Sequence, residues 1–499
     1  MSSRSEHSMW NRLFQLSGTS GQSLQSQLRE ALVKAILDGH IPADIPLPSS
    51  RELAKQLGVA RNTVVLAYQH LIDEHYLVAK ERRGYFVNRE ILQGRVNVPP
   101  AGLAANDAGD EPDWSDRFPR DLKQKRNIDR PLDWQQFKYP FIYGQIDPSL
   151  FPVNDWRESC RMSLRVSAIS EWTHDRVDHD DELLVEQIHT RVLPRRGVWA
   201  SSDEILITTG AQNALYLISQ LLLGPNKCVG IEDPCYVDAR NIFSLSTEQR
   251  ELFPVGDEGI EIDDRVRNCD LLYVTPSHQC PTTTTIPLAR RKELLQRASD
   301  DDFIIVEDDY ESELNFVGEP TPALKSLDTE GRVIYVGSLS KTLAPGLRVG
   351  FMVGPKGFIE QARALRRLMY RHPPTNNQRT VGHFLALGHH DSVMLKLSQA
   401  FRSRWIAMDN ALSRHLSLTS NAPGFGGSSF WVALPEHLSA ARLEKLAADQ
   451  GVIINAGDHY FASREGPRNY FRLGFSSIAE NRIEPGIQQL AALVSQLDT

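Results

Sequence analysis

The chain of 499 residues has few cysteines, no long apolar run and no excess of basic charge. Its five cysteines, Cys160, Cys228, Cys235, Cys269 and Cys280, are scattered and form no CxxC pair. This pattern excludes a disulfide framework and a cysteine-rich zinc site. No apolar run reaches about 18 residues, and the first residues lack the apolar centre of a secretion signal. We therefore expect a cytoplasmic protein without a membrane span.

The net charge of −8, taken over the whole chain, argues against nucleic-acid binding. The charge is uneven, however. Residues 1–88 hold ten Lys or Arg and eight Asp or Glu, a net of +2, which leaves −10 for the rest. The length suffices for about three compact units, and a hydrophobic fraction of 41% suffices for sizeable cores. The chain can therefore carry two functions in separate domains.

Residues 1–89 are predicted to form a winged helix-turn-helix domain. Apolar residues recur at helical spacing before the first glycine stop, and short strand-like segments follow the last helix. The predicted order is a helix over residues 23–37, a proline-rich connector, a helix over residues 51–58 capped by Ser49 or Ser50, a helix from about residue 60, and strands on both sides of Arg82-Arg83-Gly84.

Five side chains of this segment are candidates for DNA contacts. One helix of such a motif braces the DNA backbone, while the next lays its N-terminal residues in the major groove. Arg61, Asn62 and Thr63 begin that second helix, where base-reading side chains belong. Arg51, at the start of the bracing helix, and Arg83, in the wing, suit phosphate or minor-groove contacts. Taken singly, such residues are equally compatible with a solvated helix start.

A linker is predicted over residues 90–134, because its first part is poor in large apolar residues and contains Pro99-Pro100. Over residues 135–499, apolar runs alternate with long helical patterns. This alternation predicts an α/β domain with a mostly parallel sheet. The runs are EILITT, CVGIED, DLLYVT, FIIVED and RVIYVG.

Lys341 follows the predicted strand RVIYVG within the segment GSLSKTLAPGLRVG. A lysine in this setting, among small and hydroxyl residues, suits a Schiff base with pyridoxal phosphate. Ser338 lies three residues earlier and Arg348 seven residues later, so both can reach one phosphate group. For Lys341 alone, a solvated lysine is the alternative.

Other strand ends supply the remaining groups that this cofactor needs. Asp308, in FIIVEDDYESEL, can hold the pyridine nitrogen protonated, and Tyr310 can point toward the ring phenolate. Gly210 joins a strand to a helix start, so the backbone N–H groups of Ala211 and Gln212 form an anion site.

Three further side chains are candidates for contacts with the ring or an effector. Tyr236, in EDPCYVDAR, can stack on the ring, and Arg472, in YFRLGFSS, offers a fork for a carboxylate. Asp238 would suit an effector with a second positive charge, such as a diamino acid. Each candidate also has an ordinary explanation: a helix cap for Asp308, a core position for Tyr236, a surface ion pair for Arg472 and a solvated loop acid for Asp238.

His383, His389 and His390 are close together in the sequence but do not predict a metal site. No Cys, Asp or Glu frames them at convincing ligand spacing beyond Asp391. We expect solvated histidines at a helix end, and no metal.

In this order, the motifs resemble two known families joined in one chain. LPSSRELAKQLGVARNTVVLAYQHL, followed by a wing that ends GYFV, resembles a GntR-type DNA-binding domain. Residues 135–499 resemble a fold-type I aminotransferase, and the whole chain resembles the MocR/GabR-type regulators of the GntR family. It departs from the family at Ala60, where a hydroxyl cap is usual, and at Pro281-Thr282-Thr283, where PTG is usual. Threonine adopts the positive φ of glycine only at a cost, so we expect that loop to be shaped differently.

The resemblance implies a transcriptional regulator that depends on pyridoxal phosphate. Lys341 would hold the cofactor as an internal aldimine, an amino acid or related amine would replace it as an external aldimine, and Arg472 would bind the effector's carboxylate. The family resemblance implies a homodimer, with each head docked on its partner, that binds paired half-sites in double-stranded operator DNA. The alternatives are an active aminotransferase that carries a DNA-binding head, and a regulator that has lost the cofactor.

Overall fold

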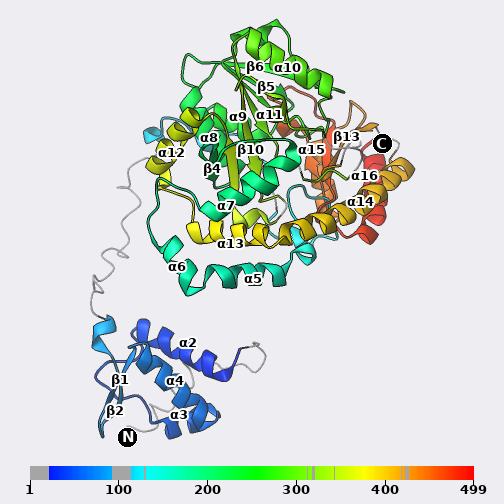
Figure 1. The fold of residues 1–499 in the computed structure, drawn as a ribbon. Helices are drawn as coiled ribbons and strands as arrows, with labels where there is room; N and C mark the ends of the chain where they lie inside the picture. Colours follow the sequence, from blue (N-terminus) through cyan, green and yellow to red (C-terminus); the bar gives the residue numbers. More distant parts are fainter. Residues whose placement is uncertain are drawn as a thin grey trace. The chain divides into compact units, whose positions relative to one another are not determined.

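The structure is a computed structural model that describes residues 22–92, 114–128, 131–311, 313–316, 321–341, 343–416, 419–421 and 426–498. The chain divides into two compact units, one within residues 1–119 and one within residues 120–499. Figure 1 shows both, with the helices and strands labelled.

The first unit is a winged helix-turn-helix, as predicted. Helices α2 and α3 pack against α4, and the two strands pair antiparallel, with Leu77 opposite Val87 and Lys80 opposite Gly84. Buried leucine, isoleucine, valine and alanine side chains of the three helices form its core. The elements are α2 (Leu24–Leu37), α3 (Ser50–Leu57), α4 (Arg61–Asp73), β1 (Leu77–Lys80) and β2 (Gly84–Val87).

The N-terminal caps of α3 and α4 differ. Ser49 caps α3, since its hydroxyl accepts a hydrogen bond from the Glu52 N–H at 3.3 Å. Gly58 ends that helix in the left-handed conformation, with φ at 66°. Helix α4 follows Ala60, whose side chain makes no cap hydrogen bond. The first turn of α4 therefore lacks the side-chain acceptor that α3 has.

The second unit is built on an eight-stranded sheet with the order β4-β11-β10-β9-β8-β5-β6-β7. Strands from β10 to β6 run parallel, whereas β11 runs antiparallel to both its neighbours and β7 antiparallel to β6. The mostly parallel sheet is thus confirmed. The strands are β4 (Ile205–Thr208), β5 (Val229–Asp233), β6 (Arg250–Gly256), β7 (Gly259–Ile260), β8 (Leu271–Val274), β9 (Ile304–Asp308), β10 (Val333–Ser338) and β11 (Gly350–Val353).

Both faces of this sheet are buried, which is why its strands are continuous apolar runs. In β8, Leu271 and Tyr273 pack with α8 and α9 in one core cluster, while Leu272 and Val274 pack with α10 in another. The helices of this part are α5 (Val153–Ser163), α6 (Val166–Thr173), α7 (Glu182–Gln187), α8 (Ala211–Leu222), α9 (Val237–Phe243), α10 (Leu288–Asp300), α11 (Leu324–Leu327), α12 (Lys356–Tyr370) and α13 (Thr375–Ala386).

A smaller lobe follows, built on a four-stranded sheet with the order β12-β13-β16-β15. The early strand β3 (Tyr139–Pro140) pairs in parallel with β14 (Val452–Ile453), so the chain near residue 140 lies in this lobe. The other elements are β12 (Thr419–Asn421), β13 (Ser429–Ala433), β15 (Asn455–Ala456), β16 (Tyr470–Gly474), α14 (His389–His415), α15 (Ala440–Asp449) and α16 (Ile483–Asp498).

Residues 120–128, part of the predicted linker, lie on the second unit. The Asn241 side chain of α9 donates a hydrogen bond to the carbonyl oxygen of Arg126 at 2.8 Å. The Arg126 guanidinium donates to the carbonyl oxygen of Phe461 at 2.8 Å. The chain is therefore fixed to the second unit before β3 begins, while the middle of the predicted linker lies outside the described residues.

His390 is buried, so the expectation of a solvated histidine was wrong there. Its side chain is 3% exposed, and its Nε2 lies 3.2 Å from the Glu313 carboxylate. The first turn of α14 packs against the interior, and helical spacing alone does not show this. Among the described residues, no three His, Cys, Asp or Glu side chains are grouped as a metal ion requires. No described helix has the length and apolar character needed to cross a membrane.

Thr283 takes up the backbone conformation that favours glycine, with φ at 66°. The expectation of a differently shaped loop stays a prediction, and Thr283 itself adopts the costly conformation. Its N–H donates to the Gln279 carbonyl oxygen at 2.7 Å, and its hydroxyl donates to the Thr282 carbonyl oxygen at 2.6 Å. These hydrogen bonds offset a backbone conformation that costs about 1–3 kcal/mol for a residue with a Cβ.

The missing cap of α4 leads to a stability prediction. Ala60→Ser should stabilise the first turn of α4 by about 1 kcal/mol, because a serine hydroxyl can accept the hydrogen bond that alanine cannot. Hydrogen exchange of the α4 amides in the full-length chain should then slow by about fivefold. Ser49→Ala is the matched control for α3 and should speed exchange there. Unchanged exchange in Ala60→Ser would contradict the prediction.

Candidate functional site

A cavity of about 200 Å³ lies at the carboxyl end of the parallel strands, the edge where α/β sheets bind ligands. Nine of the residues selected from the sequence line it: Ala211, Gln212, Tyr236, Asp238, Asp308, Tyr310, Ser338, Lys341 and Arg348. Other lining residues were not singled out: Tyr143, Gly144, Gln145, Cys280, Ser340 and Pro345. Residues from distant parts of the second unit thus meet in one cavity.

Asp308 is buried in the cavity wall at the end of β9, with 2% of its surface exposed. Its Oδ2 accepts a hydrogen bond from the Tyr273 hydroxyl at 2.8 Å, whereas its Oδ1 has no partner among the described residues. Burial raises the pKa of Asp308 to about 7, against the lowering effects of the Tyr273 hydrogen bond and the Lys341 charge. A buried acceptor without a donor is fitted to receive an N–H from a ligand.

The start of α8 and Arg348 form a cationic end of the cavity. Gly210 precedes α8 with φ at 90°, and a Cβ built there would lie 2.8 Å from Arg348 Nη2, so only glycine fits. The Arg348 guanidinium is held by a hydrogen bond to the Thr209 carbonyl oxygen at 2.9 Å. The first N–H groups of a helix have no partner within it, and its dipole favours anions. This end is suited to a phosphate group.

Lys341 follows β10 and lies beside aromatic rings. Its Nζ lies 3.4 Å from the Tyr143 hydroxyl, 4.5 Å from the centre of the Tyr143 ring and 5.9 Å from the centre of the Tyr310 ring. The amino group is therefore held in the cavity, partly buried, rather than extended into solvent.

Asp238, Gln212 and Tyr236 form a hydrogen-bonded triad on the opposite wall. Asp238 Oδ2 accepts from Gln212 Nε2 at 2.5 Å and from the Tyr236 hydroxyl at 3.0 Å. Since Tyr236 directly precedes α9 and Asp238 lies in its first turn, the start of that helix fixes the orientation of the tyrosine ring. The triad gives the cavity an ordered aromatic wall.

Arg472, on β16, is fully buried at 0% exposure and has no ion pair with a described residue, so a surface ion pair is the wrong explanation for it. Its Nε donates to the Ser429 hydroxyl at 2.7 Å, and its Nη1 lies 3.6 Å from the Cys280 sulfur. Its Nη2 has no hydrogen-bond partner among the described residues. A buried cation without a counter-ion is costly, and this one is suited to an anionic ligand.

Arg472 does not line the cavity, because Tyr143 and Cys280 lie between them. The centre of the Tyr143 ring lies 3.3 Å from the guanidinium carbon. The sequence offered a weak signal for Tyr143, which belongs to the aromatic segment FKYPFIYG, and none for Cys280.

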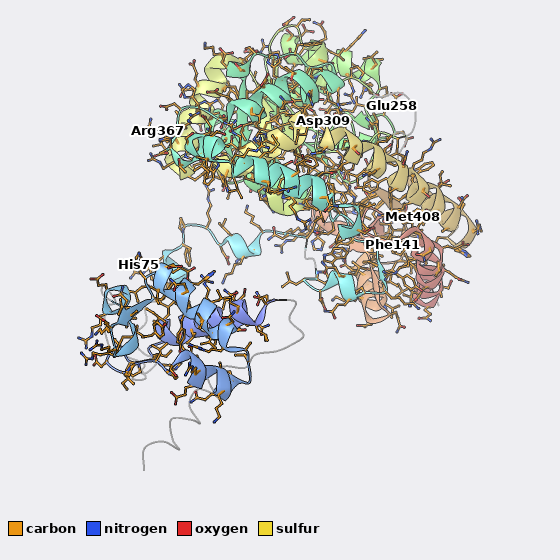
Figure 2. All side chains as sticks on the ribbon, turned by 60° about the horizontal axis from the view of Figure 1, so that its bottom comes forward. His75, Phe141, Glu258, Asp309, Arg367 and Met408 are labelled. Atoms are coloured by element: carbon orange, nitrogen blue, oxygen red, sulfur yellow. The ribbon has the colours of Figure 1, made fainter. Side chains whose placement is uncertain are left out.

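Behind Asp308, a second buried network holds the strand ends in place. Asp309, labelled in Figure 2, accepts hydrogen bonds from Arg196 at 2.8 Å and from Tyr335 at 2.9 Å. Arg196 also donates to the Ser277 hydroxyl at 2.9 Å. These groups pair with one another, so they support the site and leave Asp308 as the acid that faces the cavity.

The cavity offers a fitting group for three parts of pyridoxal phosphate. Lys341 lies where an aldehyde carbon can be bound, the free Oδ1 of Asp308 can accept from a protonated pyridine nitrogen, and the start of α8 can receive the phosphate.

The five candidates for DNA contacts all belong to the first unit, and their roles stay predictions. Arg61 and Asn62 are exposed at the start of α4, Thr63 is half-buried beside them, Arg51 is exposed on α3, and Arg83 is exposed in the turn between β1 and β2.

Comparison with known proteins assigns each unit to a family. Residues 24–87 match "Bacterial regulatory proteins, gntR family", and residues 187–490 match "Aminotransferase class I and II". The HTH-type transcriptional regulator TauR of Rhodobacter capsulatus is 40% identical over 94% of this chain and 96% of its own length. The probable rhizopine catabolism regulatory protein MocR of Rhizobium meliloti is 28% identical over 95% of this chain and 94% of its own length.

Among solved structures, the α-aminoadipate aminotransferase LysN of Thermus thermophilus is similar to the second unit. It superposes with a TM-score of 0.69 at 29% identity and covers 77% of this chain and 98% of its own. That structure is complexed with N-(5'-phosphopyridoxyl)-L-leucine.

The unpaired oxygen of Asp308 leads to a prediction about pH. Its pKa of about 7 exceeds the ordinary value of 3.8, so the folded chain keeps a proton that the unfolded chain loses. This contribution to stability therefore falls as pH rises from about 4 to about 7. Asparagine at position 308 resembles the protonated acid. Without cofactor, the Asp308→Asn variant should therefore have a higher melting temperature than the wild type at about pH 8, and the difference should shrink toward pH 5, as calorimetry can measure.

The affinity of the Asp308→Asn variant for pyridoxal phosphate should fall by about 10- to 100-fold in absorbance titrations, because a charged hydrogen bond is lost.

Glu232→Gln provides a matched control. Burial also raises the pKa of Glu232 to about 7, but this side chain bonds Thr275 and Gln279 and does not line the cavity. The variant should keep its affinity for the cofactor. Equal loss of affinity in both variants would contradict the role assigned to Asp308.

Proposed function

Because this chain belongs to the MocR/GabR-type regulators of the GntR family, we propose that it senses an amino acid or related amine through pyridoxal phosphate and adjusts operator binding in response. This proposal is supported mainly by one cavity, whose lining includes Lys341, the unpaired oxygen of Asp308 and the start of α8.

When bound, pyridoxal phosphate supplies an aldehyde carbon that bonds amines reversibly and a ring that withdraws electrons. Lys341 would hold that carbon and release it to an entering amine. Asp308 Oδ1 would keep a proton on the pyridine nitrogen, while Tyr236 would support one ring face. The N–H groups that begin α8 would bind the phosphate together with Arg348 and Ser338.

Lys341 and Arg472, which lie apart from each other, together indicate the chemical class of the effector. Lys341 selects an amine, and the buried, uncompensated guanidinium of Arg472 selects an acid. We therefore propose an amino acid as effector. A diamino acid would require Asp238 to bind a second ammonium group, and the two hydrogen bonds that its Oδ2 already accepts favour a positioning role instead.

A route for the response leads from the cavity toward the DNA-binding unit along the chain. Tyr236 and Asp238 lie at the start of α9, and Asn241 of the same helix holds the carbonyl oxygen of Arg126. Residues 120–128 continue N-terminally into the segment that leads to the first unit. A shift of α9 on effector binding would thus pull on that chain, and the effector would change the populations of operator-binding states.

We also propose a homodimer whose two heads bind paired half-sites. The first unit is only mildly basic, so one head should bind DNA weakly, and two linked heads gain from effective concentration. A wide groove of about 910 Å³ adjoins the cavity and shares Gln212, Asp238 and Arg348 with it. A partner subunit covering this groove would complete the phosphate end of the site.

An active aminotransferase with a DNA-binding head is the second candidate, because Lys341, Asp308 and Tyr310 are also the residues that catalysis would need. Incubating the loaded protein with amino acids and a 2-oxo acid acceptor separates the two. We expect a shift in cofactor absorbance without repeated turnover. Repeated turnover would contradict a pure sensor.

The candidate DNA contacts should separate into two kinds. Arg61→Ala should weaken operator binding by about 1–3 kcal/mol and relax base preference, because the start of α4 reads base edges. Arg83→Ala should weaken binding to all DNA sequences alike, and should reduce the slope of log affinity against log salt concentration by about 1. Salt-dependent fluorescence anisotropy with operator and scrambled duplexes measures both. Identical effects of the two variants would contradict this assignment.

A further inference from the structure

Arg472 is closed off from the cavity that holds Lys341. Its side chain is 0% exposed, and it is absent from the cavity lining, although Tyr143 and Cys280 line it. The Tyr143 ring covers one flat face of the guanidinium at 3.3 Å, and the Cys280 sulfur lies 3.6 Å from Nη1 at its edge. An acid in the cavity therefore cannot reach the guanidinium in this conformation.

The guanidinium is nevertheless left short of acceptors. A thiol is a weak acceptor, and Nη2 has no partner among the described residues. Burying a cation this way is unfavourable, so a state in which an anion pairs with it is stabilised relative to this one. The arrangement is that of an anion site that is closed while no acid is bound.

Tyr143 is the group that can open it. Its hydroxyl lies 3.4 Å from Lys341 Nζ, so one side chain contacts both the amine site and the anion site. Gly144 follows with φ at 75°, a conformation that glycine adopts without strain.

The chain on both sides of Tyr143 and Gly144 is fixed to the smaller lobe. The Phe141 carbonyl oxygen accepts from the Gly474 N–H at 2.9 Å, and the Gln145 carbonyl oxygen accepts from the Ser476 hydroxyl at 2.6 Å. Phe141 is labelled in Figure 2. A displacement of the Tyr143 ring therefore requires a rotation of its side chain and does not require the flanking backbone to leave the lobe.

We propose that Tyr143 is a gate that determines specificity: it covers Arg472 in the free protein, and the acid group of an effector displaces its ring to reach the guanidinium. This rests on the proposed function, in which Lys341 binds the amine and Arg472 the acid. The apparent affinity for acids equals the affinity of the open form multiplied by the fraction of time that the gate is open. The affinity for simple amines does not depend on the gate. The effector is thus selected by both groups and by the distance between them.

The test uses the full-length protein loaded with pyridoxal phosphate and a ladder of probes. Glycine, 3-aminopropanoate and longer ω-amino acids are each paired with the n-alkylamine that lacks the acid. Absorbance titration gives the ratio of the two affinities for each chain length. In Tyr143→Ala this ratio should rise by about tenfold, the effect of removing a gate that is closed about 90% of the time.

Two further variants make the outcome specific. Tyr143→Leu keeps buried apolar volume but loses the flat stacking face, and should raise the ratio in the same direction. Tyr470→Ala removes another tyrosine of the same aromatic cluster, one that stacks on Trp431 at 5.4 Å, and should leave the ratio unchanged.

A ratio that stays constant or falls in both Tyr143 variants overturns the gate. If amines change the cofactor spectrum in wild type but the Tyr143 variants do not alter the ratio, the gate fails and the proposed function stands. If no amine changes the spectrum in any variant, the proposed function fails, and the gate fails with it.

Discussion

Burying the Asp308 carboxylate costs free energy, which a proton or a positively polarised partner at its Oδ1 can offset. Tyr273 satisfies the other oxygen and Asp309 pairs with Arg196, so Asp308 Oδ1 is left as a buried acceptor without a partner among the described residues. A ligand that pairs with this oxygen binds the folded state and not the unfolded one, and therefore stabilises the fold. Cofactor binding and the stability of the domain therefore both depend on the same carboxylate.

The smaller lobe contains a second uncompensated charge of opposite sign, at Arg472. The two charges do not pair with each other, because Tyr143 and Cys280 separate the guanidinium from the cavity. In the proposed function, each serves a different part of what binds: Asp308 a ring nitrogen, Arg472 an acid. A ligand that satisfied both sides would connect the large sheet with the smaller lobe.

Much of the site could be predicted from the sequence because its residues follow strands. Lys341, Asp308 and Gly210 each stand after an apolar run, and parallel strands bring their carboxyl ends to one edge. Tyr143 and Cys280 could not be predicted, because their importance arises from contacts with Arg472, which lies near the end of the chain. Local patterns do not encode which distant segments meet.

The same limit explains the error at His390. His390 lies in a polar stretch of sequence, and only the packing of α14 shows that it faces Glu313. At Thr283 the backbone preference of threonine is outweighed by hydrogen bonds to its own near neighbours in the sequence, Gln279 and Thr282. A single-residue preference contains neither the distant partner of His390 nor the local hydrogen bonds of Thr283.

Helix α4 begins without a side-chain cap, at the residue before Arg61. Its first N–H groups are consequently available to a phosphate oxygen, the partner that the end of a helix attracts most. If DNA binds at this end, the contact would complete the helix as well as anchor it, and part of the binding free energy would be spent on ordering the protein's own backbone.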